Sequence, residues 1–415
     1  MNSGQDAKSE ILIQMERSSS RRGFLAAGLA LPAAGLAAPP QAVSGEVKLA
    51  YRALGKTGVK VTALSFGCMT TSDASVIEHA ADVGIIHFDT ARAYQNGNNE
   101  RMVGAALKSR RQKVVISSKS ASKTRQEALA DLETSLRELG TDYLDIWYLH
   151  MKHEPAEVTD DLLEAQRIAK KQGKIRFAGV SMHFNMDRML AYLAELGQID
   201  VALTTYNFAM RSVAAGMNRN TAAPKTDMTA AIREARKSGM GIVAMKTLAG
   251  GIARVRRGDR LYGAEPQALT KQLSQPGAAL AAIKWALRNE SVDTAIVCMT
   301  DHDQLQENLS AMAEPYSERD EKLLAQQLAR IAPIYCRMCG SCTGVCERGV
   351  PVPDMLRFLS YAEGYGQFAM ARERFLELPE RVRAIRCADC VSCSVDCPNG
   401  VRVRERVSRV QELLA

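Results

Sequence analysis

Eight short runs rich in β-branched and aromatic residues alternate with helical patterns between Val47 and Ala313. The candidate strands are Ala63–Phe66, Ile85–Phe88, Val114–Ser117, Leu144–Leu149, Ile175–Val180, Val201–Tyr206, Gly241–Met245 and Thr294–Cys298. Candidate helices between them include Arg125–Leu139, Leu162–Gln172 and Gly277–Arg288. Eight strand–helix units predict an α/β fold, a (β/α)8 TIM barrel, whose active site forms at the C-terminal ends of the strands.

Chemically versatile side chains occur where the early strands of this barrel end. Asp89 follows the second strand with Tyr94 in the loop behind it, Lys119 follows the third strand, and His150 follows the fourth. Each residue alone has an ordinary explanation, such as a helix cap, a core edge or a solvated charge. Their occurrence at successive strand ends instead predicts that the four side chains meet in one site.

The sequence around these residues resembles the aldo/keto reductase family. The resemblance is carried by FDTARAY at 88–94 with ERMVGAAL after it, SSKS at 117–120, DYLDIWYLH at 142–150 and GVS at 179–181. It covers nearly the whole predicted barrel. It implies an oxidoreductase that interconverts a carbonyl and an alcohol by hydride transfer, with the family's catalytic tetrad at Asp89, Tyr94, Lys119 and His150.

The resemblance also implies a role for each member of the tetrad. Tyr94 would be the general acid that protonates the carbonyl oxygen. An unperturbed tyrosine has a pKa of about 10, so a nearby cation is needed to make its proton mobile near neutrality. Lys119 would supply that cation, Asp89 would hold Lys119, and His150 would orient the carbonyl.

The resemblance also implies a nicotinamide cofactor, NADP(H) or NAD(H). The residues that would hold its nicotinamide ring depart from the family pattern. Ser181 is kept, whereas Met182, Leu203 and Met245 replace the usual Asn, Gln and aromatic residue. Methionine can still pack on a ring face. The expected cofactor contacts are Ser181, Tyr206, Met245, Lys246, Gln304 and Asn308.

The phosphate end of the cofactor site is ambiguous in the sequence. Gln304 and Asn308 resemble the family's last motif, at a helix start whose free N–H groups suit an anion. The arginine that often binds the 2'-phosphate is absent, and Asp301 and Asp303 would either repel a phosphate or cap the helix. Lys246 could compensate if it points into the pocket. NADP is the leading expectation.

Eight of the ten cysteines form two runs, each spaced C-x2-C-x2-C-x3-C. The first run is Cys336, Cys339, Cys342 and Cys346, and the second is Cys387, Cys390, Cys393 and Cys397. Thiolates at this spacing are typical of iron–sulfur proteins, in which the fourth cysteine of each run ligates the other cluster. We therefore expect two [4Fe-4S] clusters, with Cys397 joining the first run and Cys346 the second. Two zinc sites or a disulfide scaffold are the alternatives, although neither run contains a histidine.

The runs resemble those of bacterial two-cluster ferredoxins, but about forty residues separate them, far more than in a compact ferredoxin. Apolar residues recur at helical intervals in this spacer, at Met355, Phe358, Leu359 and Ala362, then at Phe368, Ala371 and Phe375. This pattern predicts a small, mainly helical ferredoxin-like domain. The expected domains are a signal and linker (1–46), the barrel (47–315) and the iron–sulfur domain (316–415).

The N-terminus resembles a twin-arginine export signal, with Arg21 and Arg22 before Phe24 and an apolar stretch to Ala38. Such a signal implies a bacterial protein that the twin-arginine machinery exports, already folded, to the periplasm. A cleavage site after Ala37 fits, and Met15 could be the true start. The alternative is a basic tail without a targeting role. The formal net charge of +8 is spread along the chain, so nucleic-acid binding is not indicated.

The two remaining cysteines, Cys68 and Cys298, follow strands one and eight, which are neighbours in a closed barrel. An exported protein could join them as a disulfide, and two buried thiols are the alternative.

Three functions fit these features. The first is an oxidoreductase acting on a small carbonyl or sugar-like substrate, with clusters that transfer electrons or stabilise structure. The second is an electron-transfer protein whose barrel docks a redox partner without turnover. The third is an enzyme that acts on sugars and retains its nicotinamide.

The electron counts of the two kinds of cofactor differ. Hydride transfer moves two electrons at once, whereas a cluster passes one, and the sequence contains no flavin motif that could link the two processes. The segments Met210–Met228 and Ile252–Leu273 offer material for a substrate pocket.

Overall fold

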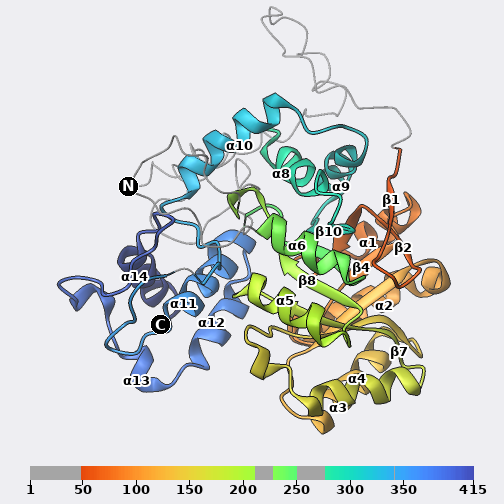
Figure 1. Cartoon of the computed structure of the whole chain (residues 1–415), viewed down its shortest axis with the longest axis horizontal. Coiled ribbons are helices and arrows are strands. Elements are labelled where there is room, and N and C mark those ends of the chain that lie inside the picture. The colour runs from red at the N-terminus through yellow and green to blue at the C-terminus, as the bar shows by residue number, and fades with distance from the viewer. Residues whose placement is uncertain (1–47, 211–227, 250–275, 341) are drawn as a thin grey trace, which may run out of the picture. The chain divides into compact units, whose positions relative to one another are not determined.

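The computed structural model describes residues 48–210, 228–249, 276–340 and 342–415 (Figure 1). The predicted export signal lies outside these residues, as do 211–227 and the whole of Ile252–Leu273. In the described part of the chain, no helix combines the length and apolarity needed to cross a membrane. Residues 47–415 form one compact unit.

Eight parallel strands close into a barrel in the order β10-β3-β4-β5-β6-β7-β8-β9. They are β3 (Leu64–Gly67), β4 (His87–Asp89), β5 (Val115–Ser120), β6 (Leu144–Leu149), β7 (Ile175–Met182), β8 (Val201–Thr205), β9 (Gly241–Met245) and β10 (Thr294–Cys298). The ends of each strand lie within three residues of the predicted ones, because short apolar runs bounded by polar or glycine residues are typical of buried parallel strands. The predicted barrel is confirmed.

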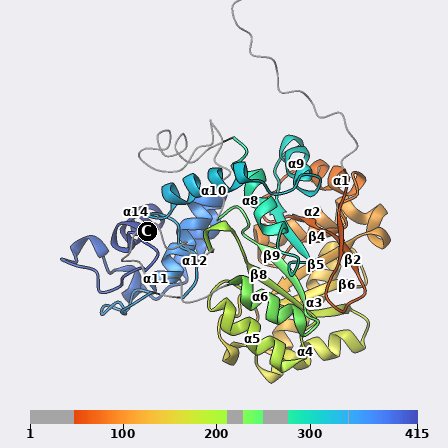
Figure 2. The same ribbon diagram turned by 45° about the horizontal axis from the view of Figure 1, so that its top comes forward.

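Helices surround the strands (Figure 1 and Figure 2). They are α1 (Ala74–Asp82), α2 (Asn98–Leu107), α3 (Arg125–Leu139), α4 (Asp160–Lys171), α5 (Met186–Leu196), α6 (Met228–Lys237), α8 (Ala278–Leu287) and α9 (His302–Leu309). Helix α3 has the predicted bounds because both ends are capped. The Thr124 hydroxyl accepts from the Glu127 N–H, and Gly140 takes the left-handed conformation that ends the helix.

An antiparallel hairpin of β1 (Tyr51–Ala53) and β2 (Lys60–Thr62) packs against the N-terminal ends of the strands. Leu54 and Val61 are fully buried against barrel-interior residues such as Val243. Gly55 has a φ of 55°, and a Cβ there would lie 2.4 Å from the Gly241 nitrogen, so only glycine fits this contact. The hairpin covers this end of the barrel, and the site must open at the other end.

Helices dominate the C-terminal region: α10 (Glu318–Ile331), α11 (Val352–Leu359), a π-helical turn (Ser360–Gly364), α12 (Phe368–Leu376), α13 (Glu380–Arg383) and α14 (Val403–Leu414). The residues from α11 onward share a second core, which includes Met355, Phe358, Phe375 and Val407. Helix α10 instead packs Leu324 and Leu328 into the core of the barrel. The mainly helical character expected of this region is confirmed, while the domain boundary at 315 stays a prediction.

Candidate active site

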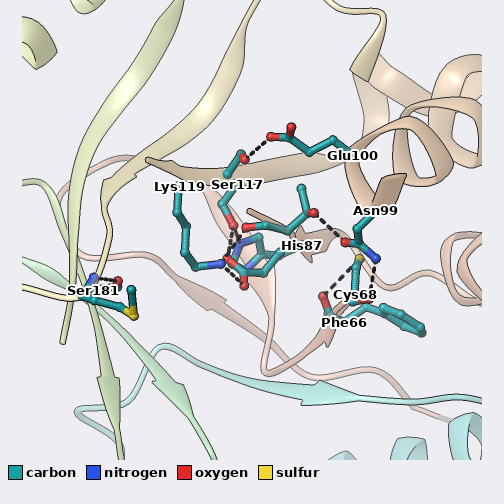
Figure 3. A network of polar contacts seen from close by, with 12 residues as sticks. Phe66, Cys68, His87, Asn99, Glu100, Ser117, Lys119 and Ser181 are labelled. Carbon is teal, nitrogen blue, oxygen red and sulfur yellow. Dashed lines mark hydrogen bonds and ion pairs between the residues drawn. The ribbon is translucent and has the colours of Figure 1, made fainter. Parts of the chain in front are cut away.

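A buried ion pair joins neighbouring strands at the C-terminal end of the barrel. Lys119 Nζ lies 2.5 Å from Asp89 Oδ2 and 2.6 Å from the Thr90 carbonyl oxygen. The other oxygen of Asp89 accepts from the Ser117 hydroxyl at 2.7 Å, and Ser117 Oγ lies 3.0 Å from His87 Nε2. Figure 3 shows Lys119, Ser117 and His87 lying close together in this network. The network fixes the position of the Lys119 ammonium.

Tyr94 opens a short 3₁₀ turn (Tyr94–Gly97) in which Gln95 and Asn96 are left-handed. Its ring centroid lies 4.9 Å from Lys119 Nζ. Burial, followed by the Asp89 carboxylate, raises the pKa of Tyr94 well above its usual range. Burial is thus the dominant influence on the phenol, although the Lys119 ammonium lies close by. Tyr94 therefore keeps its proton at neutral pH, as a proton donor must.

His150 follows β6, and its ring lies edge-on to Tyr94 with 6.1 Å between centroids. Burial, followed by the charges of Lys119 and Arg374, lowers the pKa of His150 well below its usual range. The imidazole is therefore neutral. Within the described residues its Nδ1 has no hydrogen-bond partner. The structure thus brings together all four predicted tetrad residues, and the neutral histidine can hydrogen-bond a ligand.

A cavity of about 100 Å³ lies over these residues. Asp89, Tyr94 and His150 line it, whereas Lys119 lies beneath it. Four lining residues come from the C-terminal region and are called here the roof residues: Tyr361, Tyr365, Met370 and Arg374. Sequence reasoning missed them because their spacer carries no known motif. The unusual length of the spacer was the signal that could have drawn attention to them.

Ion pairs and one sulfur contact hold the roof. Glu363, in the π-helical turn between Tyr361 and Tyr365, accepts from Arg406 at 2.5 Å and from Arg409 at 3.2 Å. Arg357 of α11 is buried and donates to Met151 Sδ, in the loop after β6, at 3.2 Å. The roof is therefore tied both to α14 and to the mouth of the barrel.

Only two of the six predicted cofactor residues, Met245 and Lys246, line the cavity. The Ser181 hydroxyl accepts from the Met151 N–H at 3.0 Å, away from the network in Figure 3. Tyr206 does not line the cavity, because its ring packs at a tilt on Trp285 of α8 with 4.8 Å between centroids. Its assignment to the cofactor stays a prediction.

The helix that follows β10 uses its polar residues for capping. Asp301 Oδ1 accepts from the Gln304 N–H at 2.8 Å, which confirms the capping alternative for Asp301. The Gln304 amide turns back to Thr300 and Asp301, and Asn308 is buried. Neither Gln304 nor Asn308 lines the cavity, and their expected contact with the phosphate end of a cofactor stays a prediction.

The two cysteine runs pair side by side in opposite directions. Thr343 and Asp396 exchange two backbone hydrogen bonds of 3.0 Å, and the Ser394 hydroxyl donates to the Val345 carbonyl at 2.9 Å. A Cβ on Gly344 would lie 2.0 Å from the Ser394 carbonyl oxygen, so glycine permits this approach. The pairing brings the end of each run beside the other run.

The thiols fall into two groups of four. Burial raises the pKa of Cys336 to about 12, with smaller contributions from Cys339, Cys342 and Cys397. Burial likewise raises the pKa of Cys387 to about 11, with contributions from Cys390, Cys346 and Cys393. The cysteines in each group are those that the sequence spacing assigns to one cluster, and the clusters themselves stay a prediction.

Donors surround the sulfur atoms. The Met338 N–H donates to Cys336 Sγ and the Asn399 amide to Cys339 Sγ, both at 3.4 Å. Arg348 approaches Cys390 Sγ at 3.8 Å. Such contacts favour sulfur that carries negative charge, as in a metal-bound thiolate.

All ten cysteines are free thiols, so the disulfide scaffold and the Cys68–Cys298 disulfide are both wrong. Cys68 is buried, and Cys298 lines the cavity. Across the described ranges, no three His, Cys, Asp or Glu side chains converge closely enough to hold a single metal ion.

Comparison with known proteins identifies relatives of the barrel part of the chain. The family model "Aldo/keto reductase family" matches residues 65–328. The chain belongs to the aldo/keto reductase family. It is accordingly an oxidoreductase, and the match ends before the first cysteine run.

Curated relatives of this aldo/keto reductase include two enzymes that it covers almost completely. It is 25% identical over 319 residues to the L-glyceraldehyde 3-phosphate reductase of Escherichia coli K12, across 64% of this chain and 88% of the relative. It is 24% identical over 322 residues to the L-galactose dehydrogenase of Arabidopsis thaliana, across 69% and 96%. A solved structure of an aldo-keto reductase from Bacillus halodurans, in its holo form, superimposes on this chain with a TM-score of 0.54 at 22% sequence identity. The superposition covers 68% of this chain and 96% of that one, so the two proteins share a fold.

Proposed function

We propose that this protein reduces a small carbonyl compound to an alcohol, with Tyr94 as the proton donor. The observation that carries the proposal is the convergence of Asp89, Tyr94, Lys119 and His150 at one cavity. A carbonyl oxygen in the cavity would accept hydrogen bonds from the Tyr94 hydroxyl and from neutral His150. The Tyr94 proton moves to that oxygen as the carbon is reduced, and the buried Lys119 ammonium offsets the negative charge left on the phenol.

A nicotinamide cofactor, NADP(H) or NAD(H), would supply the hydride. The fit is partial. Met245 offers a surface for a ring face and lines the cavity. Met182 and Leu203, which replace amide residues of the family, are buried and offer no hydrogen bond to a carboxamide. We therefore assign the nicotinamide ring to the Met245 side of the cavity.

The proposal includes two [4Fe-4S] clusters that transfer single electrons. Cys336, Cys339, Cys342 and Cys397 would hold one, and Cys387, Cys390, Cys393 and Cys346 the other. The grouping of the thiols and the donors to their sulfur atoms support this assignment. A short connection leads from the first group to the cavity: Tyr335 precedes Cys336, its hydroxyl accepts from Asn207, and Asn207 also donates to the Lys246 carbonyl.

The substrate class is proposed from the relatives. Their names specify a phosphorylated aldehyde of three carbons and a hexose. A small sugar-like carbonyl compound is therefore our first choice for this chain.

We further propose that the protein is exported to the bacterial periplasm. The support is the Arg21-Arg22 pair before an apolar stretch in the sequence. The test is fractionation of cells that express the full chain or its Arg21→Lys/Arg22→Lys variant. Retention of the variant in the cytoplasm is expected, and equal export of both proteins would overturn the proposal.

The decisive experiment is anaerobic purification of the full chain with analysis of iron, sulfide and bound nucleotide. The same sample is then tested for NADPH or NADH consumption with aldehydes, ketones and sugars. Tyr94→Phe should reduce kcat by about 10²- to 10⁴-fold. Tyr148→Phe is the control because Tyr148 is fully buried in the barrel and does not line the cavity. Nucleotide that survives purification would favour the cofactor-retaining enzyme.

A second candidate is an electron carrier whose barrel docks a redox partner. Val345 and Val391, beside Cys346 and Cys390, are 82% and 97% exposed, and Arg348 and Arg404 lie next to them. An apolar spot among arginines suits an acidic redox protein. Cluster reduction without turnover of any carbonyl compound would select this candidate.

A further inference from the structure

Lys246 is a cation in the cavity that the proposed proton transfer does not use. It follows β9 in the left-handed conformation, with a φ of 56°. Its carbonyl accepts from the Asn207 amide and from the Ala249 N–H, both at 3.0 Å, and these bonds hold the turn. The cost of this conformation for a lysine is offset by these contacts.

The Lys246 ammonium is enclosed by aromatic rings. Its Nζ lies 5.3 Å from the Tyr361 centroid and 5.2 Å from the Tyr365 centroid. Within the described ranges no carboxylate forms an ion pair with it. The side chain is half-buried and faces the cavity. A partly desolvated ammonium without a counter-ion favours a ligand that supplies one.

The rest of the cavity has an excess of positive charge. Arg374 of α12 also lines it, and its Nη1 donates at 2.8 Å to Glu377, which does not line the cavity. Asp89 is the only carboxylate among the described lining residues, and Lys119 already pairs with it. Burial, then Arg357, lowers the pKa of Lys246 to about 7, and Cys298 opposes this. The other titratable groups that face the cavity are Tyr94, His150, His183, Tyr361 and Tyr365.

We propose that Lys246 and Arg374 bind an anionic group of the substrate, a carboxylate or a phosphate, so that the enzyme prefers acidic carbonyl compounds to neutral ones. The proposal rests on the proposed carbonyl reduction and adds its substrate class. It assigns one anion-binding residue to the barrel and the other to the roof, so the roof selects the substrate as well as covering it.

Matched substrates test the proposal. Glyoxylate and glycolaldehyde differ in a carboxylate, as do D-glucuronate and D-glucose, and glyceraldehyde 3-phosphate and glyceraldehyde differ in a phosphate. At pH 6.5 we expect kcat/KM for the acidic member of at least one pair to exceed that of its neutral partner by about tenfold or more, the effect of one charged hydrogen bond. A larger acid-to-neutral ratio of kcat/KM in the carboxylate pairs would indicate a carboxylate site, and a larger ratio in the phosphate pair would indicate a phosphate site.

Variants of Lys246 then show whether this side chain causes the preference for acidic substrates. Lys246→Met should bring the acid-to-neutral ratio close to one, and Lys246→Arg should preserve it. In the wild type KM for the acid should rise above pH 7 as Lys246 loses its proton, and in Lys246→Arg this rise should disappear. The exposed Lys237→Met is the control and should match the wild type. A Lys246→Met variant that raises only the KM for the nicotinamide cofactor would overturn the proposal, because the anion would then belong to the cofactor.

Failure of the proposed function can be separated from failure of this inference. If neutral and acidic carbonyls are reduced equally well, the inference is wrong and carbonyl reduction stands. If no carbonyl compound is turned over, carbonyl reduction is wrong, and thermal unfolding with glyoxylate or inorganic phosphate decides the inference. An anion-induced rise in Tm in the wild type but not in Lys246→Met would support the anion site, and equal shifts would refute it.

Discussion

The side-chain amide of Asn207, just after strand β8, donates a hydrogen bond of 3.1 Å to the hydroxyl of Tyr335, the residue before Cys336. Both side chains are buried. The same amide donates to the carbonyl of Lys246 in the cavity wall. One residue thus links the first cysteine run to the active-site end of the barrel.

Tyr335→Phe should lower the free energy of unfolding by about 1 kcal/mol, because a buried amide hydrogen loses its acceptor while the ring is kept. Urea unfolding of the purified protein measures this change. Tyr148→Phe removes a buried hydroxyl that has no hydrogen-bond partner among the described residues, so it should have almost no effect. Equal losses in the two variants would contradict the importance of the Asn207 contact.

Asp89→Ala should destabilise the fold by about 3–5 kcal/mol, because it leaves the Lys119 ammonium buried with only a carbonyl acceptor. The double variant Asp89→Leu/Lys119→Met should be more stable than Asp89→Ala, because neither charge remains. A double variant whose loss equals the sum of the single losses would show that the two residues act independently.

The stability of the protein should rise with pH between about 7 and 10 through Lys246. Its pKa is about 7 in the folded protein and about 10.4 in an unfolded chain, so in this window the unfolded chain binds more protons. The contribution to the slope is at most about 1.4 kcal/mol per pH unit. Unfolding curves at several pH values should show a smaller slope for Lys246→Met, and an unchanged slope would contradict the lowered pKa.

Much of the fold could be predicted from the sequence because its signals are local. Strand β6 and helix α3 were predicted with their observed bounds, since apolar runs, a capping threonine and a terminal glycine mark them. In the spacer, Met355, Phe358, Leu359, Ala362, Ala371 and Phe375 are buried as their spacing predicts.

The site could be predicted only where a family motif marks it. The tetrad residues meet, but the pKa of Tyr94 depends on burial and on the nearby Asp89 carboxylate, which no local pattern reports. The direction of the Tyr206 side chain could not be predicted because the last residue of a predicted strand can point either way, and here the ring packs on Trp285. The roof could not be predicted because it depends on contacts between segments more than 200 residues apart in the sequence, such as that between Arg357 and Met151.

Cys346→Ser and Cys393→Ser should each remove the same cluster, although these residues belong to different runs. Iron per chain should fall from about eight to about four in both variants, and their EPR spectra should agree. Cys397→Ser should remove the other cluster. Cys68→Ser, outside both groups, is the control and should keep all the iron. Loss of different clusters in Cys346→Ser and Cys393→Ser would refute the exchange of the fourth cysteine.

Glu363→Gln should loosen the roof, because a half-buried carboxylate that accepts from two arginines is replaced by a neutral amide. We expect KM for the substrate to rise several-fold with a smaller change in kcat, since the tetrad is untouched. Steady-state kinetics measure both parameters. Glu377→Gln, which alters an exposed ion pair, should have less effect, and the reverse order would contradict the role of Glu363.

The roof residues lie between the two cysteine runs in the sequence, after Cys346 and before Cys387. A gene fusion that joined this segment to an ancestral barrel would therefore have delivered a lid and two sets of thiolates in a single event. Later mutations could then alter the range of molecules admitted while leaving the proton donor unchanged. For an engineer, exchange of residues 347–386 is the corresponding unit of change.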